Sequence, residues 1–288
     1  MYGEDARTIA ELSIDDYLYP DADLYNVSGL PPLALPPLTC DLSSGRWVFD
    51  NVSVPAYREK DCTFLTKQVS CLANGRPDDM WQYWRWQPNE CSLPTFDARR
   101  FMEAMRGKRL MFVGDSLNRN QWESLVCLVQ SILSKGRKKI VKRGSFNTFY
   151  AKDPQNWGNP DGIKCVRETL PYQNYSQHLD LYHDMRLYDL VVNVASSMEK
   201  VPVTVINITR MSDYRKDAHT SLYTIRQGKL LTPKQKADPE KFADCIHWCL
   251  PGVPDVWNQI LYTRILSKSS WHSNFSPPPS QSLPLPPQ

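Results

Sequence analysis

The chain has 288 residues, of which 41% are hydrophobic and 23% are charged. This composition is typical of a globular protein and excludes a disordered or fibrous one. The 34 basic and 31 acidic residues leave a net charge of +3, whereas a dedicated nucleic-acid-binding protein usually has a much larger basic excess. We therefore expect a folded protein without a nucleic-acid partner.

The cysteines and glycosylation sequons indicate an oxidising compartment. The eight cysteines are even in number and none forms a C-x-x-C pair, so no zinc or other metal site is expected. Of five N-x-[ST] sequons, we take Asn51, Asn174 and Asn207 as the glycosylation candidates. Residues 1–30, however, contain no apolar segment suited to a signal peptide or membrane anchor. Either the anchor is missing from this chain or the cysteines stay reduced, and we favour the first explanation.

Composition divides the chain into four segments. Residues 1–39 end in Pro and Leu and are typical of an unfolded leader or linker. Residues 40–92 combine four cysteines with several tryptophans, which predicts a small subdomain stapled by disulfides. Residues 93–268 form the predicted main domain, and residues 269–288 are a Ser/Pro-rich tail that cannot pack a core.

The predicted elements of the main domain alternate between strands and helices. The apolar run Arg109–Val113 stops at Gly114, which predicts a strand and a tight turn, and helical spacing follows over 120–133. Three more segments are predicted, namely a helix over 185–198, a buried strand over Val201–Ile208 and a closing helix over 255–266. This order favours the α/β class with a parallel sheet. Only two buried strands are found, whereas such a sheet needs about five.

The tripeptide Gly114-Asp115-Ser116 lies where the predicted strand meets the predicted helix. A serine at this place projects from the carboxyl end of a strand, where α/β proteins carry their chemistry. Its backbone N–H lies near the helix N-terminus and could stabilise an oxyanion. On the tripeptide alone, a helix cap is the more common role for Asp115 or Ser116. Asn118 and Arg119 follow closely enough to contact a bound substrate.

A serine nucleophile needs a base and a carboxylate that orients the base, and D-x-x-H pairs supply both. One such pair, Asp180 and His183, lies in a polar stretch and is expected at the surface. The other, Asp244 and His247, is expected in a loop flanked by two cysteines, where disulfides would hold it rigidly. We interpret Asp244 and His247 as catalytic and the first pair as coincidental.

Three further clusters each allow two interpretations. Trp84 and Trp86 could stack on a glycan or fill the core. Residues 135–143 hold six basic side chains in nine, which favours a solvated edge over a site for acidic sugars or phosphates. Residues 214–219 could line a cleft, although a charged loop is the simpler interpretation.

Six motifs resemble the plant trichome birefringence-like proteins, and most strongly those that are xylan O-acetyltransferases. The motifs are CDLSSGRWVFDN, CTFLTKQVSC, WQYWRWQPNEC, FVGDSLNRNQWESLVC, NITRMSDYRKDAHTSLY and DCIHWCLPGVPDVWN. The resemblance implies a Golgi-lumenal enzyme with a membrane anchor and an SGNH/GDSL-like PC-esterase domain. It implies Ser116 as nucleophile, His247 as base and Asp244 as orienting carboxylate. Acetyl would pass from acetyl-CoA or an acetylated intermediate, through Ser116, to a xylosyl hydroxyl, with no metal or bound cofactor.

The resemblance also implies four disulfides, namely Cys40–Cys91, Cys62–Cys127, Cys71–Cys249 and Cys165–Cys245. The chain departs from the family near residues 153–156, where roughly a hundred residues of a complete domain are expected but absent. We therefore expect unpaired strand edges and an uncovered apolar face. Of the oxyanion donors, the Ser116 amide remains and Gly144 is a second candidate.

Two other functions stay open beside acetyl transfer. A carbohydrate or lipid esterase would use the same triad with water as acceptor, and it differs from a transferase in how water is excluded. A non-catalytic glycan-binding protein would use the tryptophans while the triad stays unassembled. The acetyl donor, the O-2 or O-3 position, the identity of the glycan and the oligomeric state are left undetermined.

Overall fold

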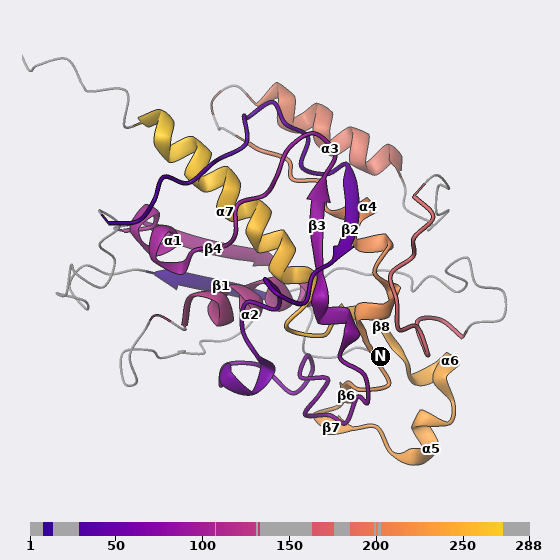
Figure 1. Ribbon diagram of the computed structural model, residues 1–288. Coiled ribbons are helices and arrows are strands. Elements are labelled where there is room, and N and C mark those ends of the chain that lie inside the picture. Colours follow the sequence, from indigo (N-terminus) through magenta and orange to yellow (C-terminus); the bar gives the residue numbers. More distant parts are fainter. Residues whose placement is uncertain are drawn as a thin grey trace, which may run out of the picture.

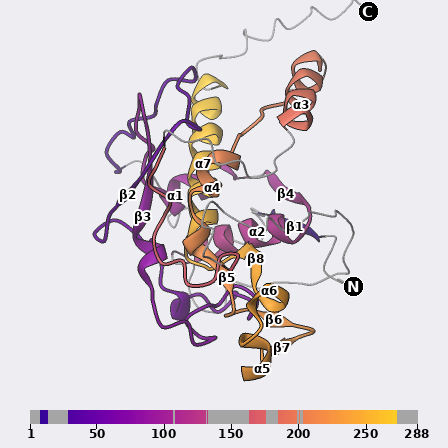
Figure 2. The same ribbon diagram turned by 90° about the vertical axis from the view of Figure 1, so that its right-hand side faces the viewer.

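The computed structural model describes residues 8–13, 29–106, 108–130, 132, 163–175, 185–198, 200 and 203–272, and the statements below concern these residues. Helices and strands are mixed along this part of the chain, which, together with the family match reported below, confirms the predicted α/β class (Figure 1). Helix α7 (Val253–His272) runs through the middle of the molecule, whereas α3 (Met185–Ser197) stands at its periphery in both views (Figures 1 and 2).

The cysteine-rich N-terminal part contains one antiparallel pair of strands, with two short 3-10 helices between them in the chain. Strand β2 (Gly45–Phe49) pairs antiparallel with β3 (Trp84–Pro88), and the register places Trp47 opposite Trp86. Both indole rings are buried and meet edge-on, with centroids 5.5 Å apart. The 3-10 helices are η2 (Glu59–Asp61) and η3 (Met80–Tyr83). Alternation along the two strands thus turns one aromatic face into the core.

The main domain begins with the predicted strand and helix. Helix α1 (Ala98–Ala104) precedes β4 (Arg109–Gly114), and α2 (Ser116–Gln130) starts two residues after β4 ends, which confirms the two predicted elements. Strand β4 pairs antiparallel with β1 (Thr8–Ser13). Residues 8–13, inside the predicted unfolded leader, therefore form a strand, because the backbone of β4 offers a ladder edge with which they pair.

The C-terminal part is built from short elements that end in the long helix α7. The predicted helices at 185–198 and 255–266 are confirmed as α3 and α7, and α7 is longer than predicted. Strand β8 (Asp244–Trp248) pairs antiparallel with β5 (His219–Ser221) across an irregularity in register. The remaining elements are α4 (Thr209–Asp213), η4 (Lys216–Ala218), β6 (Ile225–Arg226), β7 (Lys229–Leu230), α5 (Pro233–Lys236) and α6 (Pro239–Phe242).

The strand pairing differs from the prediction. The ladders among the described residues are β1–β4, β2–β3, β5–β8 and β6–β7, and each is two-stranded and antiparallel rather than parallel. The strand predicted over Val201–Ile208 is also wrong, because residues 203–208 form no ladder and Val203 and Val205 are exposed. A run of β-branched residues becomes a central strand only where neighbouring strands accept its backbone hydrogen bonds.

The core joins the N-terminal part to the main domain. Five tryptophans from both parts lie in one buried cluster, namely Trp47, Trp81, Trp86, Trp248 and Trp257. A second cluster packs α1, α2, β4 and α7 together around Phe101, Leu125 and Tyr262. All eight cysteines are paired, in the four disulfides that the family resemblance implies. Among the described residues, no helix has both the length and the apolar character needed to cross a membrane.

Candidate active site

Ser116 is the first residue of α2 and follows directly on the turn after β4. The Asp115 carboxylate accepts hydrogen bonds from the backbone N–H of Leu117 (2.9 Å) and Asn118 (3.4 Å), so Asp115 is the helix cap. These two amides are thereby occupied. The amide of Ser116 is left as the candidate oxyanion donor from this helix end.

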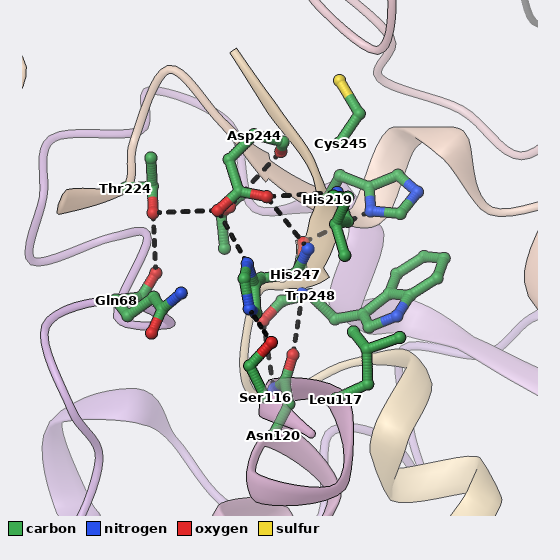
Figure 3. Close-up of polar contacts among 12 residues, drawn as sticks. Gln68, Ser116, Leu117, Asn120, His219, Thr224, Asp244, Cys245, His247 and Trp248 are labelled. Atoms are coloured by element: carbon green, nitrogen blue, oxygen red, sulfur yellow. Dashed lines mark hydrogen bonds and ion pairs between the residues drawn. The ribbon is translucent and has the colours of Figure 1, made fainter. Parts of the chain in front are cut away.

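Three side chains predicted from the sequence meet in a line (Figure 3). Ser116 Oγ lies 2.7 Å from His247 Nε2, and His247 Nδ1 lies 2.8 Å from Asp244 Oδ2. Ser116 is 131 residues away from His247 in the sequence. The arrangement is that of a nucleophile, a base and a carboxylate that orients the base.

Asp244 and His247 lie on β8 and not in a loop, which corrects the prediction. Side chains three residues apart on a straight strand would point to opposite faces. Here Asp244 Oδ1 accepts hydrogen bonds from the backbone N–H of Ile246 and of His247, both at 3.1 Å. The chain curls around the carboxylate in the manner of an Asx turn, which brings the two side chains together.

The charge and hydrogen bonding of each partner shift the pKa of the other. Burial alone would lower the pKa of His247, but the charge and hydrogen bond of Asp244 outweigh it and raise this pKa. Burial alone would raise the pKa of Asp244, but His247 and the backbone amides hold it well below its usual range. Asp244 is therefore anionic at neutral pH, and His247 is the group that takes up a proton.

His219 packs against β8, a contact that no sequence pattern indicated. Its ring stacks on Trp248 with centroids 3.8 Å apart, and its Nδ1 lies 3.2 Å from the carbonyl oxygen of His247. Burial lowers the pKa of His219 to about 3. The ring is thus neutral, and Nδ1–H donates to that carbonyl.

Thr224 is a second group missed by sequence reasoning. Its buried hydroxyl lies 3.3 Å from Asp244 Oδ2 and 3.4 Å from the carbonyl oxygen of Gln68. One hydroxyl hydrogen can serve only one of these acceptors well at a time. Thr224 therefore links the carboxylate of Asp244 loosely to the segment around Gln68.

Two of the predicted substrate contacts lie beside the triad. A Cβ atom on Gly114 would come within 1.8 Å of Asn118 Oδ1, so the Asn118 side chain folds over the glycine at the end of β4. Arg119 hydrogen-bonds to Gln68 Oε1 and forms an ion pair with Glu123 at 3.7 Å. Its positive charge also opposes protonation of His247. Asn118 and Arg119 thus stay candidates for contacts with substrate.

The predicted tryptophan platform is not assembled at the triad. Trp86 is only 2% exposed and its indole N–H donates to the Leu42 carbonyl at 2.9 Å, so its ring has no face free for a sugar. Trp84 is partly buried against Phe49 and lines a separate cavity of about 230 Å³ together with Asp255. Both residues belong to the packing of the N-terminal part.

Other predicted features lie away from the triad or outside the described residues. Residues 214–219 are buried and contain an Arg215–Asp217 ion pair at 3.0 Å, so the interpretation as a charged surface loop is wrong. The sequon residues Asn51 and Asn174 are exposed, whereas the half-buried Asn207 accepts a hydrogen bond from Thr209 N–H. Four predictions fall outside the described residues, namely Gly144, Asp180/His183, the basic run 135–143 and the gap near 153–156.

The sequence matches the PC-Esterase family, a GDSL/SGNH-like acyl-esterase family found in Pmr5 and Cas1p, over residues 93–155 and 152–264. The chain belongs to this family. The PMR5 N-terminal domain family matches residues 38–92.

Several named plant proteins are similar to this chain. It is 58% identical to Xylan O-acetyltransferase 4 and to Xylan O-acetyltransferase 3 of Oryza sativa subsp. japonica, over the whole chain and over 84% and 88% of those proteins. It is 32% identical to Protein trichome birefringence-like 31 of Arabidopsis thaliana, over 82% of this chain and 84% of that protein.

The alignments with the relatives are longer than this member of the PC-Esterase family. The alignments with the two rice proteins extend over 406 residues, whereas this chain has 288. The family match falls into two parts that meet at residues 152–155, the place where the sequence departs from the family's pattern. The aligned parts of the relatives thus contain residues that have no counterpart here.

Proposed function

We propose that this chain is an O-acetyltransferase that transfers acetyl groups to xylan through an acetyl-Ser116 intermediate. The observation that carries the proposal is the continuous contact from Ser116 through His247 to Asp244, at 2.7 and 2.8 Å. We infer acetyl as the transferred group and xylan as the acceptor from the names of the two rice relatives, which are 58% identical to this chain.

The first half-reaction forms the acetyl-enzyme. Ser116 Oγ attacks the acetyl carbon of an ester or thioester donor, acetyl-CoA or an acetylated intermediate, while His247 Nε2 takes up the hydroxyl proton. The bond between the acetyl carbon and the donor's oxygen or sulfur then breaks, and the departing alcohol or thiol leaves with the proton from His247. Asp244 stabilises the imidazolium that forms between these two events.

The second half-reaction releases the acetyl group to the acceptor. A xylosyl hydroxyl attacks the acetyl carbon and gives its proton to His247. The Ser116 Oγ–carbon bond breaks, and Oγ recovers the proton. The Ser116 amide would stabilise the oxyanion in both halves, with Gly144 as the second candidate donor. Asn118 and Arg119 lie beside the triad, and we propose them as contacts with the polysaccharide.

We further propose that the protein acts in the Golgi lumen and is associated with the Golgi membrane. The four disulfides and the exposed sequon residues Asn51 and Asn174 support an oxidising compartment in which proteins are glycosylated. We propose that residues 40–92 form the N-terminal domain, residues 93–268 the catalytic domain with an internal section lacking near 153–156, and residues 269–288 a tail, of which residues 269–272 are the last residues of α7.

The description of the family as acyl-esterases favours hydrolysis as the second candidate function. Hydrolysis would use the same acetyl-Ser116 with water as acceptor. The third alternative, a glycan-binding protein with an unassembled triad, conflicts with the contacts among Ser116, His247 and Asp244.

Mass spectrometry of the intact chain tests the proposal. After brief exposure to p-nitrophenyl acetate, we expect one acetyl group on the parent chain and none on Ser116→Ala. Xylo-oligosaccharide should then remove the acetyl group and become acetylated. Loss of acetyl to buffer, with unmodified oligosaccharide, would favour the esterase. Absence of acetyl on a chain that melts cooperatively would contradict both activities.

A further inference from the structure

Two residue pairs lie side by side between α2 and β8 (Figure 3). The first pair is Ser116 and His247, whose side chains touch at 2.7 Å. The second pair is Asn120 and Trp248, which lie next to the first pair on the same two elements. Asn120 follows Ser116 by four residues, about one helical turn, and Trp248 is the next residue after His247 on β8.

The Asn120 side chain holds both backbone groups of Trp248. Asn120 Oδ1 accepts a hydrogen bond from Trp248 N–H at 2.8 Å, and Asn120 Nδ2 donates to the Trp248 carbonyl oxygen at 3.3 Å. The side chain is 1% exposed, so water does not compete for either contact. The carboxamide of Asn120 has an acceptor oxygen and a donor NH2 group. It can therefore pair with the N–H and the C=O of one residue, as the backbone of a neighbouring strand does.

The position of this contact matters because proton transfer depends closely on distance. A base must lie about 2.6–3.2 Å from the hydroxyl it deprotonates. The two disulfides at β8 connect it to Cys71 and Cys165, and neither of these residues lies on α2. The β5 ladder and the His219 ring likewise fix β8 against segments other than α2.

We propose that Asn120 is a positioning residue of the active site, whose two bonds to Trp248 hold Ser116 and His247 at the distance that proton transfer requires. This contact is the Asn120–Trp248 clamp. The inference deepens the proposed function, because it concerns acylation of Ser116, and it holds for either acceptor.

Asn258 offers a matched control on α7. It is also fully buried and also holds α2, because its Nδ2 donates to the Gln121 carbonyl oxygen and to Ser124 Oγ, both at 2.9 Å. These contacts join α2 to α7 and not to β8. Asn258→Ala therefore weakens the packing of the same helix without opening the clamp.

The test compares Asn120→Ala with Asn258→Ala in the full chain, with p-nitrophenyl acetate as the acetyl donor. At a pH where His247 is neutral, we expect Asn120→Ala to lower the maximal acylation rate of Ser116 about 10²-fold, since small misplacements have effects of this size. The half-saturating donor concentration should not change. Asn258→Ala should lower the melting temperature but leave the acylation rate close to that of the parent. Equal losses of rate in the two variants would overturn the clamp, as would an unchanged rate in Asn120→Ala.

A second variant tests the clamp if Asn120→Ala does not fold, and a second measurement tests it if the chain has no acylation activity. Asn120→Asp keeps the size and the acceptor but turns an oxygen toward the Trp248 carbonyl, so we expect a folded chain with slowed acylation.

Hydrogen exchange at the Trp248 amide needs no activity and can be followed in Ser116→Ala chains. Protection of this amide should be lost with Asn120→Ala and kept with Asn258→Ala; identical exchange in both would overturn the proposal. An acylated Ser116 without transfer to xylo-oligosaccharide would refute the proposed function alone.

Discussion

The surroundings of β8 and those of α3 differ in how their apolar side chains are covered. On β8, Cys245 and Trp248 are 3% and 5% exposed, and the disulfides of Cys245 and Cys249 fix the strand to two other segments. On α3, the exposed fractions of Leu190 and Val194 are 58% and 52%. In the figures, α3 stands apart from the elements that carry the triad (Figures 1 and 2).

This difference shows that the triad can assemble even where the strands have few neighbours. Ser116 and His247 are placed by α2 and β8, which share well-packed surroundings with α7. Val113 of β4 is 66% exposed. An apolar side chain near the end of a strand is exposed in this way when few other elements pack against it. The alignments with the relatives include residues that this chain lacks, and such residues are a natural source of neighbours for β4.

The largest expected effect comes from Asp244→Asn, on the well-packed side. It should slow acylation of Ser116 about 10⁴-fold, because the base loses the carboxylate that orients it and stabilises its charge. Acylation requires neutral His247, so its rate falls as pH drops through the raised pKa of this residue. In Asp244→Asn the midpoint of the residual pH–rate profile should move to lower pH. An unmoved midpoint would show that Asp244 does not set the pKa of His247.

Next in size is the contrast between two disulfides. Replacing Cys165 and Cys245 by alanine, or Cys40 and Cys91 by alanine, should each lower the free energy of unfolding by about 2–5 kcal/mol in denaturant melts. Cys245 lies next to Asp244 on β8, whereas Cys40 and Cys91 tie the N-terminal part. Acylation should therefore slow in the first variant and not in the second. Similar slowing in both would mean that the triad depends on global stability rather than on support at β8.

The smallest effect is expected on α3. Leu125→Ala, in the core-facing side of α2, should cost about 2–5 kcal/mol in free energy of unfolding, because Leu125 is only 1% exposed. Leu190→Ala should change that free energy by no more than about 0.5 kcal/mol. Thermal melts of the two variants provide the measurement. A loss in Leu190→Ala as large as that in Leu125→Ala would mean that the α3 face is covered, and the comparison would fail.

Local sequence predicted the elements whose signal lies within their own residues. The strand before Gly114, the helix after it and the closing helix α7 all follow from hydrophobic periodicity. Val201–Ile208 carries an equally clear strand signal, yet residues 203–208 have no strand partner and expose Val203 and Val205. A hydrophobic, β-branched segment is suited to a sheet, but it forms a strand only where another strand pairs with its backbone. Residues 8–13 show the reverse, since no strand is predicted there and yet they pair with β4.

The sequence by itself identified Ser116, His247 and Asp244 as the candidate nucleophile, base and carboxylate, because a strand–turn–helix junction and a D-x-x-H pair are local patterns whose chemistry depends on residue type and short spacing. Through its family resemblance, it also pointed to the four disulfide pairs. Only the tertiary structure decided that Ser116 and His247 meet across 131 residues, that Asn120 and His219 hold β8 in place, and that Trp86 belongs to the core. These contacts join residues far apart in the chain, and periodicity within one segment carries no information about which other segment packs against it.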